Sequence, residues 1–385
     1  MMRWLAALGC AGLLLAQQAR GPVEAAWSLL AKGERAQAIR LLHDIIQANP
    51  ADADARLLLG SVLMEEGEKA GSIAQLKEGV RLRPDSAEAQ NALGEAYNNF
   101  DEPKPARGSF EKAIALDPNF AQAHVNLGLI LIQAGEFAQA AGQLDRAIAL
   151  LGDKPDAAYP RYLRAKVYTQ QDQIAKAEQQ LKKAVSLRPD FAEAWSDLGE
   201  ARKTQLDDTG ALADFKRAVE LSPGDAVAQT RLGSEYLNQD QPQAAVPHLE
   251  EAVRLSPKDQ SALYNLQLAL REDGQTERAE AVKQKLTEML RAKDRAAQNA
   301  LTAIQLNNQG AALEKAGDLR GALEKYRAAL DLDPEHVGIR VNVAAALLRL
   351  GQRSQGIAEL REALRREPDN AAVKNALYDA LGQTR

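Results

Sequence analysis

Residues 87–120 have the sequence AEAQNALGEAYNNFDEPKPARGSFEKAIALDPNF, which ends two residues after Pro118. Pro84 and Pro50 precede Pro118 at successive steps of 34 residues. The same step of 34 separates Pro189, Pro223 and Pro257, and then Pro334 and Pro368. A fixed step of this kind indicates a chain built from repeated units, each of which stacks on its neighbours.

Each unit predicts two helices joined by a turn, with small residues where the helices cross. The small residues are Gly60, Gly94, Gly128, Gly199 and Gly233 in first helices, and Ala38, Ala140, Ala177, Ala211, Ala245 and Ala322 in second helices. Their lack of bulk lets two helix axes approach to about 8–10 Å. The turn position carries Gly33, Gly67, Gly135, Gly274, Gly317 and Gly351, or Asp101, Asp172 and Asp240. Glycine suits it because the left-handed conformation ends a helix there. The recurring proline then ends the second helix.

With Leu93-Gly94, Tyr97, Ala106, Phe110, Ala113 and Pro118 at these spacings, residues 87–120 resemble the tetratricopeptide repeat family. The resemblance implies an all-α fold, a right-handed superhelical solenoid of helix–turn–helix units. We count ten units: 19–52, 53–86, 87–120, 121–154, 158–191, 192–225, 226–259, 260–293, 303–336 and 337–370. A last helix over 371–381 is expected to cap the array, since repeat arrays need polar terminal caps.

Two irregularities interrupt the period. Three extra residues, 155–157, predict a lengthened loop between the fourth and fifth units. The eighth unit lacks the proline, and residues 276–309 contain neither glycine nor proline, which predicts a lengthened helix. We therefore expect an eight-unit array over 20–293, a helical joint over 294–302, and two units with the capping helix over 303–385.

The N-terminus begins MMRWLAALGCAGLLLAQQARGP, with a 12-residue apolar run over 5–16 after one arginine. This pattern predicts a signal peptide over 1–19 and export to the periplasm or the extracellular space. The run is too short for an integral membrane span, which needs about 20 apolar residues. Two alternatives remain: an extra N-terminal helix, or a lipoprotein signal at Cys10. Cys10 is the only cysteine, so the mature chain would have no disulfide and no cysteine-ligated metal.

No catalytic pattern is present in the sequence. The four histidines, His43, His124, His248 and His336, fall in separate repeats and are expected to be surface or seam residues. Phosphate-binding glycine loops and the GxSxG pattern are absent. We therefore expect no enzyme activity, no cofactor and no metal. The net charge of −5 and the lack of a basic run argue against nucleic acid as a partner.

In the tetratricopeptide family the first helices line a concave groove, and the resemblance implies that a protein or peptide binds there. Asn126, Asn265, Asn308 and Asn342 share one repeat position, with Asp197 at the same place and Asn307 beside it. This series resembles the asparagine ladder by which O-linked N-acetylglucosamine transferases grip a peptide backbone. An amide offers both a donor and an acceptor to a backbone. The series is interrupted by Leu58, Ala92, Leu163 and Arg231. The alternative is that these asparagines pack or cap the helices.

Aromatic residues add further groove candidates. Tyr159, Tyr162 and Tyr264 are expected to face the groove, where an amphipathic ring could anchor a ligand; packing in the seam is the alternative. The sequence thus predicts a non-catalytic scaffold that binds a peptide or protein segment. The alternative function is a substrate-targeting component of a protein glycosylation system that acts with a separate transferase.

Overall fold

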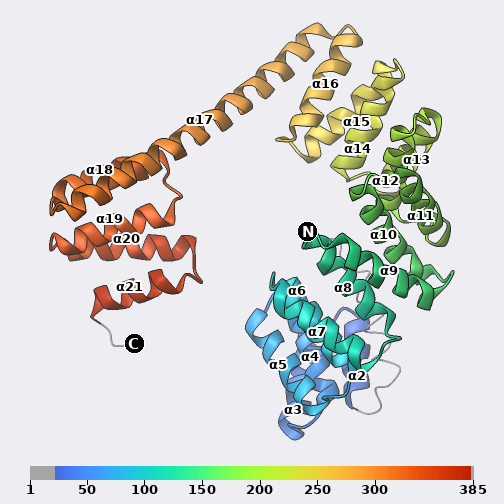
Figure 1. Cartoon of the computed structure of the whole chain (residues 1–385), viewed down its shortest axis with the longest axis horizontal. Helices are drawn as coiled ribbons and strands as arrows, with labels where there is room; N and C mark the ends of the chain where they lie inside the picture. Colours follow the sequence, from blue (N-terminus) through green and yellow to red (C-terminus); the bar gives the residue numbers. More distant parts are fainter. Residues whose placement is uncertain (1–21, 383–385) are drawn as a thin grey trace. The chain divides into compact units, whose positions relative to one another are not determined.

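The computed structural model describes residues 22–382, and the segment expected to be a signal peptide lies outside them. Helices are the only regular secondary structure in residues 22–382 (Figure 1). The described chain divides into two compact units, one ending at Leu255 and one beginning at Ser256. The predicted joint over 294–302 lies inside the second unit. No helix of the described part is both long and apolar enough to cross a membrane.

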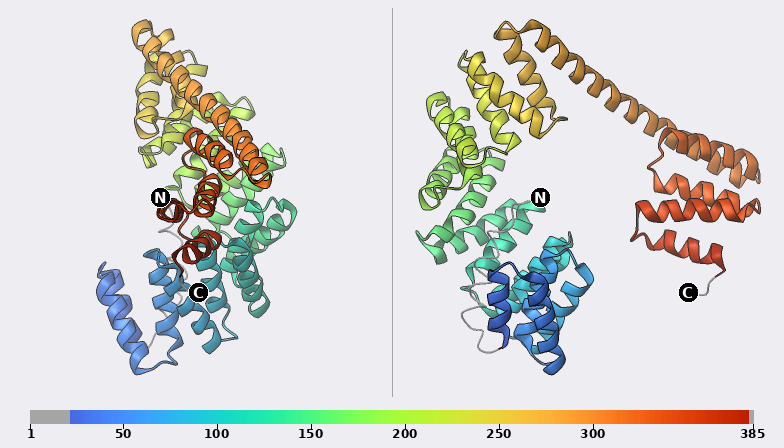
Figure 2. Two further views of the ribbon diagram at one scale, coloured as in Figure 1. Left: turned by 90° about the vertical axis from the view of Figure 1, so that its left-hand side faces the viewer. Right: turned by 180° about the vertical axis from the view of Figure 1, so that it is seen from behind.

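The first unit contains seven helix pairs stacked in sequence order (Figures 1 and 2). They are α2 (Pro22–Ala31) with α3 (Arg35–Ala48), α4 (Ala53–Glu65) with α5 (Lys69–Leu82), α6 (Ala87–Asn99) with α7 (Pro103–Leu116), α8 (Ala121–Gln133) with α9 (Phe137–Leu151), α10 (Ala158–Gln170) with α11 (Ile174–Leu187), α12 (Ala192–Thr204) with α13 (Asp208–Leu221), and α14 (Ala226–Asn238) with α15 (Pro242–Leu255). The extra residues between the fourth and fifth pairs form a short 3₁₀ helix, η1 (Pro155–Ala157). The all-α repeat architecture is confirmed.

The second unit contains α16 (Gln260–Glu272), α17 (Thr276–Lys315), α18 (Leu319–Leu332), α19 (Val337–Arg349), α20 (Arg353–Arg366) and α21 (Ala371–Leu381). The bounds of α21 are those of the predicted capping helix. Its first turn is capped by Asn370, whose Oδ1 accepts a hydrogen bond from the Val373 backbone N–H at 3.1 Å.

Helix crossings explain the small residues. A Cβ atom added to Gly94 would lie 2.5 Å from Phe110 Cε1, and one added to Gly199 would lie 2.7 Å from Phe215 Cε1. The alanines predicted for the second helices, such as Ala211, are fully buried. In the repeats that carry this glycine, the first and second helices therefore touch through a ring or a leucine placed directly on it.

Residues with a left-handed backbone conformation follow the first helices, as predicted. Gly33, Gly67, Gly135, Gly274, Gly317 and Gly351 have φ between 75° and 87°, and Asp101, Asp172 and Asp240 have φ between 54° and 58°. Leu206 occupies the same position in the sixth repeat, with φ of 64° and 85% of its surface exposed. A leucine at positive φ is strained because its Cβ approaches the following carbonyl oxygen.

Replacing Leu206 with glycine is therefore expected to stabilise the protein by about 0.5–1 kcal/mol, since relief of the strain exceeds the extra chain entropy of glycine. Little buried surface is lost because the side chain is exposed. Urea denaturation measures the change. Leu206→Ala is the matched control, because it removes the side chain but keeps the Cβ. An equal gain in both variants would contradict the conformational explanation.

The recurring prolines have a second role that the sequence did not indicate. In five repeats the proline carbonyl accepts a hydrogen bond from the side chain six residues later. The pairs are Pro50 with Arg56, Pro118 with His124, Pro189 with Trp195, Pro223 with Gln229 and Pro334 with Arg340, at 2.7–3.0 Å. Four residue types make the same contact, so no single motif reveals it. In these five places the bond fixes the start of one repeat against the end of the repeat before.

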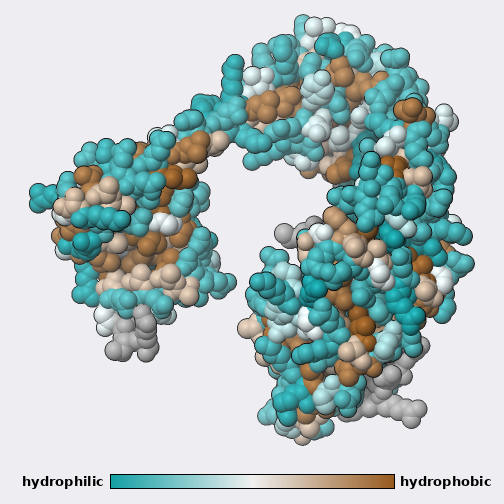
Figure 3. Space-filling view, viewed as in Figure 1, coloured by the Kyte–Doolittle hydropathy of each residue, from teal (hydrophilic) through white to brown (hydrophobic). Residues whose placement is uncertain are grey.

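Helix α17 departs from the repeat pattern. It is one helix of 40 residues, about 60 Å long. Helix α16 packs against its first part and α18 against its last part, so α17 is both the second helix of the eighth repeat and the first helix of the ninth (Figure 1). Residues 290–299 between these contacts are all exposed. Leu301 and Ile304 of α17 are exposed hydrophobic side chains. Figure 3 shows brown, hydrophobic surface where the long helix joins the helices that follow it.

Limited trypsin digestion is expected to cut first at Arg291, Lys293 or Arg295. These residues lie in the exposed middle of α17, where no packing opposes local opening. The fragments should be two folded pieces, identified by mass spectrometry. Arg217 is the internal control, because it is exposed on α13, a helix that packs along its length. Cleavage at Arg217 before the middle of α17 would contradict the prediction.

Candidate functional site

Three of the predicted groove residues meet in the first unit. Tyr159 and Tyr162 project from α10, and Asp197 projects from α12. The rings of Tyr159 and Tyr162 are 6.3 Å apart, and Phe191 lies 4.9 Å from Tyr162. Both tyrosines are half-buried in this aromatic cluster, so they contribute to the seam as well as to the surface. Tyr168 and Trp195 pack against the same buried cluster.

Burial raises the pKa of the Tyr162 phenol, and the nearby negative charge of Asp197 raises it further. The phenol therefore stays protonated at neutral pH. Tyr162 on the first helix of the fifth repeat thus lies close to Asp197 on the first helix of the sixth.

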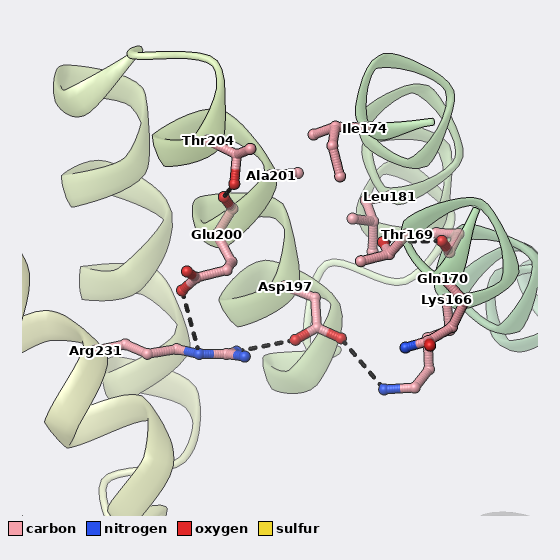
Figure 4. A pocket seen from close by; sticks show the side chains of 11 residues that line it. Lys166, Thr169, Gln170, Ile174, Leu181, Asp197, Glu200, Ala201, Thr204 and Arg231 are labelled. Carbon is pink, nitrogen blue, oxygen red and sulfur yellow. Dashed lines mark hydrogen bonds and ion pairs between the residues drawn. The ribbon is translucent and has the colours of Figure 1, made fainter. Parts of the chain in front are cut away.

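Asp197 is the centre of an ionic network that continues to α14 (Figure 4). Arg231 Nη1 donates to Asp197 Oδ1 at 2.9 Å and to Ser196 Oγ at 2.7 Å. Lys166 Nζ lies 3.8 Å from Asp197 Oδ2, and Arg231 Nε lies 3.5 Å from Glu200 Oε2. The network spans three successive first helices, and its two cations balance its two anions.

A cavity of about 180 Å³ lies beside this network, between α10, α11 and α12 (Figure 4). Ala165, Ile174, Leu181 and Ala201 supply its apolar wall. Its rim is polar, formed by Lys166, Thr169, Gln170, Asp197, Glu200, Thr204 and Arg231. The Thr169 and Thr204 hydroxyls each donate to a backbone carbonyl one turn earlier, at 3.1 and 2.9 Å. An apolar recess with a charged, accessible rim suits binding better than chemistry.

Asn126 lies in a separate hydrogen-bonded cluster between α6 and α8. Its Nδ2 donates to Asn91 Oδ1 and to Glu95 Oε1, both at 3.0 Å, and its Oδ1 accepts from Gln122 at 3.0 Å. Asn91 is buried and also donates to Glu95, at 2.9 Å. Burial raises the pKa of the Glu95 carboxyl, although the two asparagines oppose the rise. The amide of Asn126 thus joins neighbouring repeats, as the packing alternative expects.

The remaining candidates lie in the second unit and do not form one row. Asn342 Nδ2 donates to Asn307 Oδ1 at 2.8 Å, the same relation that joins Asn126 to Asn91. Asn308 is exposed near the last part of α17. Tyr264, 56% exposed, and the half-buried Asn265 lie on α16, which packs against the first part of α17. The long helix separates them from Asn308.

Several residues of the site were missed from the sequence: Lys166, Glu200, Arg231 and Asn91. An asparagine ladder expects one residue type, so it does not predict the first three as a group, and Arg231 interrupts the ladder. A signal did exist, since Asp197 and Arg231 have opposite charges at the same position of successive repeats. Within residues 22–382 no group of three His, Cys, Asp or Glu side chains could hold a metal ion.

Four family models match the chain, each described as tetratricopeptide repeat. They match residues 29–96 and 313–378, residues 119–190, residues 162–226 and 230–300, and residues 87–120. The chain belongs to the tetratricopeptide repeat family. The matches extend over most of the described residues and include both units.

Solved tetratricopeptide structures share the fold. One is from a study titled as the functional characterisation of Pseudomonas aeruginosa PilF; it is 19% identical, covers 55% of this chain and 94% of its own, and has a TM-score of 0.51. Another is PilW, described as a widely conserved type IV pilus biogenesis factor; it is 20% identical, covers 55% of this chain and 96% of its own, and has a TM-score of 0.50. At these identities the likeness concerns the fold alone. No curated protein matches the tetratricopeptide array significantly.

Proposed function

We propose that this protein is a non-catalytic scaffold that binds an extended segment of a partner protein across α10, α12 and α14. The observation that carries the proposal is the ionic network of Lys166, Asp197, Glu200 and Arg231 beside an open cavity. Tetratricopeptide arrays expose such surfaces along successive repeats and typically serve as interaction scaffolds. A segment lying across three helices can engage them together.

The exposure of the charged groups supports this role. The side chains of Lys166 and Glu200 are each 47% exposed. Their remaining hydrogen-bonding capacity can meet the backbone groups of a bound segment. We propose protein rather than nucleic acid as the partner, because the two cations and two anions of the site balance.

The glycosylation-targeting alternative depends on free asparagine amides along the groove. Asn126 and Asn342 each donate to an asparagine of the preceding repeat. That pairing favours the packing interpretation, and we therefore propose segment binding without a link to glycosylation.

Site-specific photo-crosslinking in cells tests the proposal. The crosslinking amino acid p-benzoylphenylalanine is placed at Gln170, which is exposed on the rim of the cavity. Lys183, exposed on the second helix α11, is the matched control away from the cavity. A discrete adduct at Gln170 that is absent at Lys183 is the expected result. Equal adducts at both positions, or none at either, would overturn the proposal.

We also propose that the protein is exported, because a 12-residue apolar run over 5–16 follows a single arginine at the N-terminus. Replacing Leu13 and Leu14 with aspartate should leave the full-length chain in the cytoplasm. Cell fractionation and N-terminal sequencing measure the outcome. A wild-type protein that starts at Met1 and fractionates with the cytosol would refute export.

A further inference from the structure

The size of the cavity between α10, α11 and α12 limits what it can hold. Its volume is about 180 Å³. Sites for whole small-molecule ligands are typically about 300–1,000 Å³. The cavity is therefore too small for a nucleotide or a similar cofactor, but it is large enough for one amino-acid side chain.

The cavity is apolar at one end and charged at the other. Figure 4 shows Ile174, Leu181 and Ala201 grouped together, with Arg231, Asp197 and Lys166 across the opposite end. Ala165 and Ala201 are buried and expose only methyl groups to the space. A side chain that enters between them loses its contact with water on the apolar side.

The charges at the polar end favour an uncharged occupant. Lys166 and Arg231 are both within 4 Å of Asp197, and Arg231 is also near Glu200. A charged side chain entering here would have to compete with these existing pairs while losing its own hydration. A neutral, aliphatic side chain meets no such opposition.

Glu200 can hold the backbone of the same segment. Its Oε2 lies 3.5 Å from Arg231 Nε, which is longer than an ordinary hydrogen bond, and the side chain is 47% exposed. A carboxylate has acceptor sites for several donors. A backbone N–H next to the inserted side chain could therefore donate to it.

We propose that this cavity takes one aliphatic side chain, of valine, leucine, isoleucine or methionine, from an extended partner segment whose backbone donates to Glu200. The inference rests on the proposed function and adds its specificity. The ionic network then positions the segment, and the cavity selects the residue.

Phage-displayed random peptides selected on the purified protein provide the test. Enriched peptides should share an aliphatic residue at one fixed position. Ala201→Leu, which fills the cavity, should weaken their binding by about tenfold or more, the effect expected for losing one buried aliphatic side chain. Ala213→Leu adds the same bulk at an exposed position of α13 and should leave binding unchanged.

A second variant keeps the test decisive if Ala201→Leu does not fold. Ile174→Ala removes part of the apolar wall at a half-buried position and should weaken the aliphatic preference. Circular dichroism confirms that each variant is helical.

The outcomes separate the two proposals. Failure to enrich any peptide, or enriched peptides that do not crosslink at Gln170, would overturn the proposed function. Peptides that crosslink at Gln170 but carry a charged or aromatic residue at the fixed position would overturn the cavity inference alone. So would peptides that bind Ala201→Leu as well as the wild type.

Discussion

Phe215→Ala is expected to destabilise the first unit by about 3–5 kcal/mol. The ring is fully buried, and Cε1 lies 2.7 Å from the place where a Cβ of Gly199 would stand. Ala211 and Leu232 are buried with it, and Leu212, Val219 and Tyr236 pack against this cluster. On the side of the helix crossing, Gly199 and Ala211 have no side chains that can move into the space, so that part of the cavity left by the ring would stay open. The helices α12, α13 and α14 would lose their shared contact together.

Urea denaturation followed by circular dichroism measures this loss. Because repeats are coupled only through their neighbours, a separate early transition should also become visible in the variant. Phe137→Ala is the matched control, since Phe137 is only half-buried at the start of α9. A loss at Phe215 no greater than the loss at Phe137 would show that the crossing does not depend on the ring.

Asn126→Ala is expected to destabilise the protein by about 1–3 kcal/mol at neutral pH, the range for leaving buried polar groups without a partner. The buried Asn91 loses its donor, and Glu95 loses one of its two asparagine donors. Asn308→Ala is the matched control, because Asn308 is exposed on a helix. It should change stability by less than about 0.5 kcal/mol.

The loss at Asn126 should depend on pH in a defined direction. Burial already holds the pKa of Glu95 above its ordinary value, so its favourable contribution is present at low pH and decreases as pH rises through the folded-state pKa. Removing Asn126 raises that pKa further, because its hydrogen bond favours the charged form. The destabilisation should therefore be larger at neutral pH than at pH values below the ordinary pKa of glutamate. Thermal unfolding across this range measures it, and a pH-independent loss would exclude Glu95 as the cause.

The sequence predicted most of the fold because each repeat places the same residue types at the helix crossing and at the turn. Gly94 and Phe110 show why: a glycine under a ring leaves one close crossing for the two helices. The turn at Leu206 was not predicted, because leucine is not expected at positive φ. The repeat pattern also did not predict that the second helix of the eighth repeat and the first helix of the ninth form one helix, α17. The absence of glycine and proline indicated a long helix, but it did not say which neighbours would pack on each end.

The site was predicted in part, for a geometric reason. Tyr159, Tyr162 and Asp197 come together because first helices of adjacent repeats lie side by side. The asparagines were compared at one repeat position, whereas the bonds join the sixth residue of one repeat to the fifth of the repeat before, 35 residues apart. Because neighbouring first helices are staggered, the asparagines at one repeat position do not bond to one another. Asn126 and Asn342 each bond instead to an asparagine one position earlier in the preceding repeat.

The number of residues in helix α17 sets both the distance and the direction of the helices that follow it in the second unit. Each residue of a helix advances about 1.5 Å and turns about 100°. The direction in which α18, α19, α20 and α21 point around the axis of α17, relative to α16, is therefore set by the number of residues in its exposed middle. One residue inserted there would turn those helices by more than a quarter of a circle. Inserting five full turns, about 18 residues, would move them about 27 Å along the axis while keeping their direction.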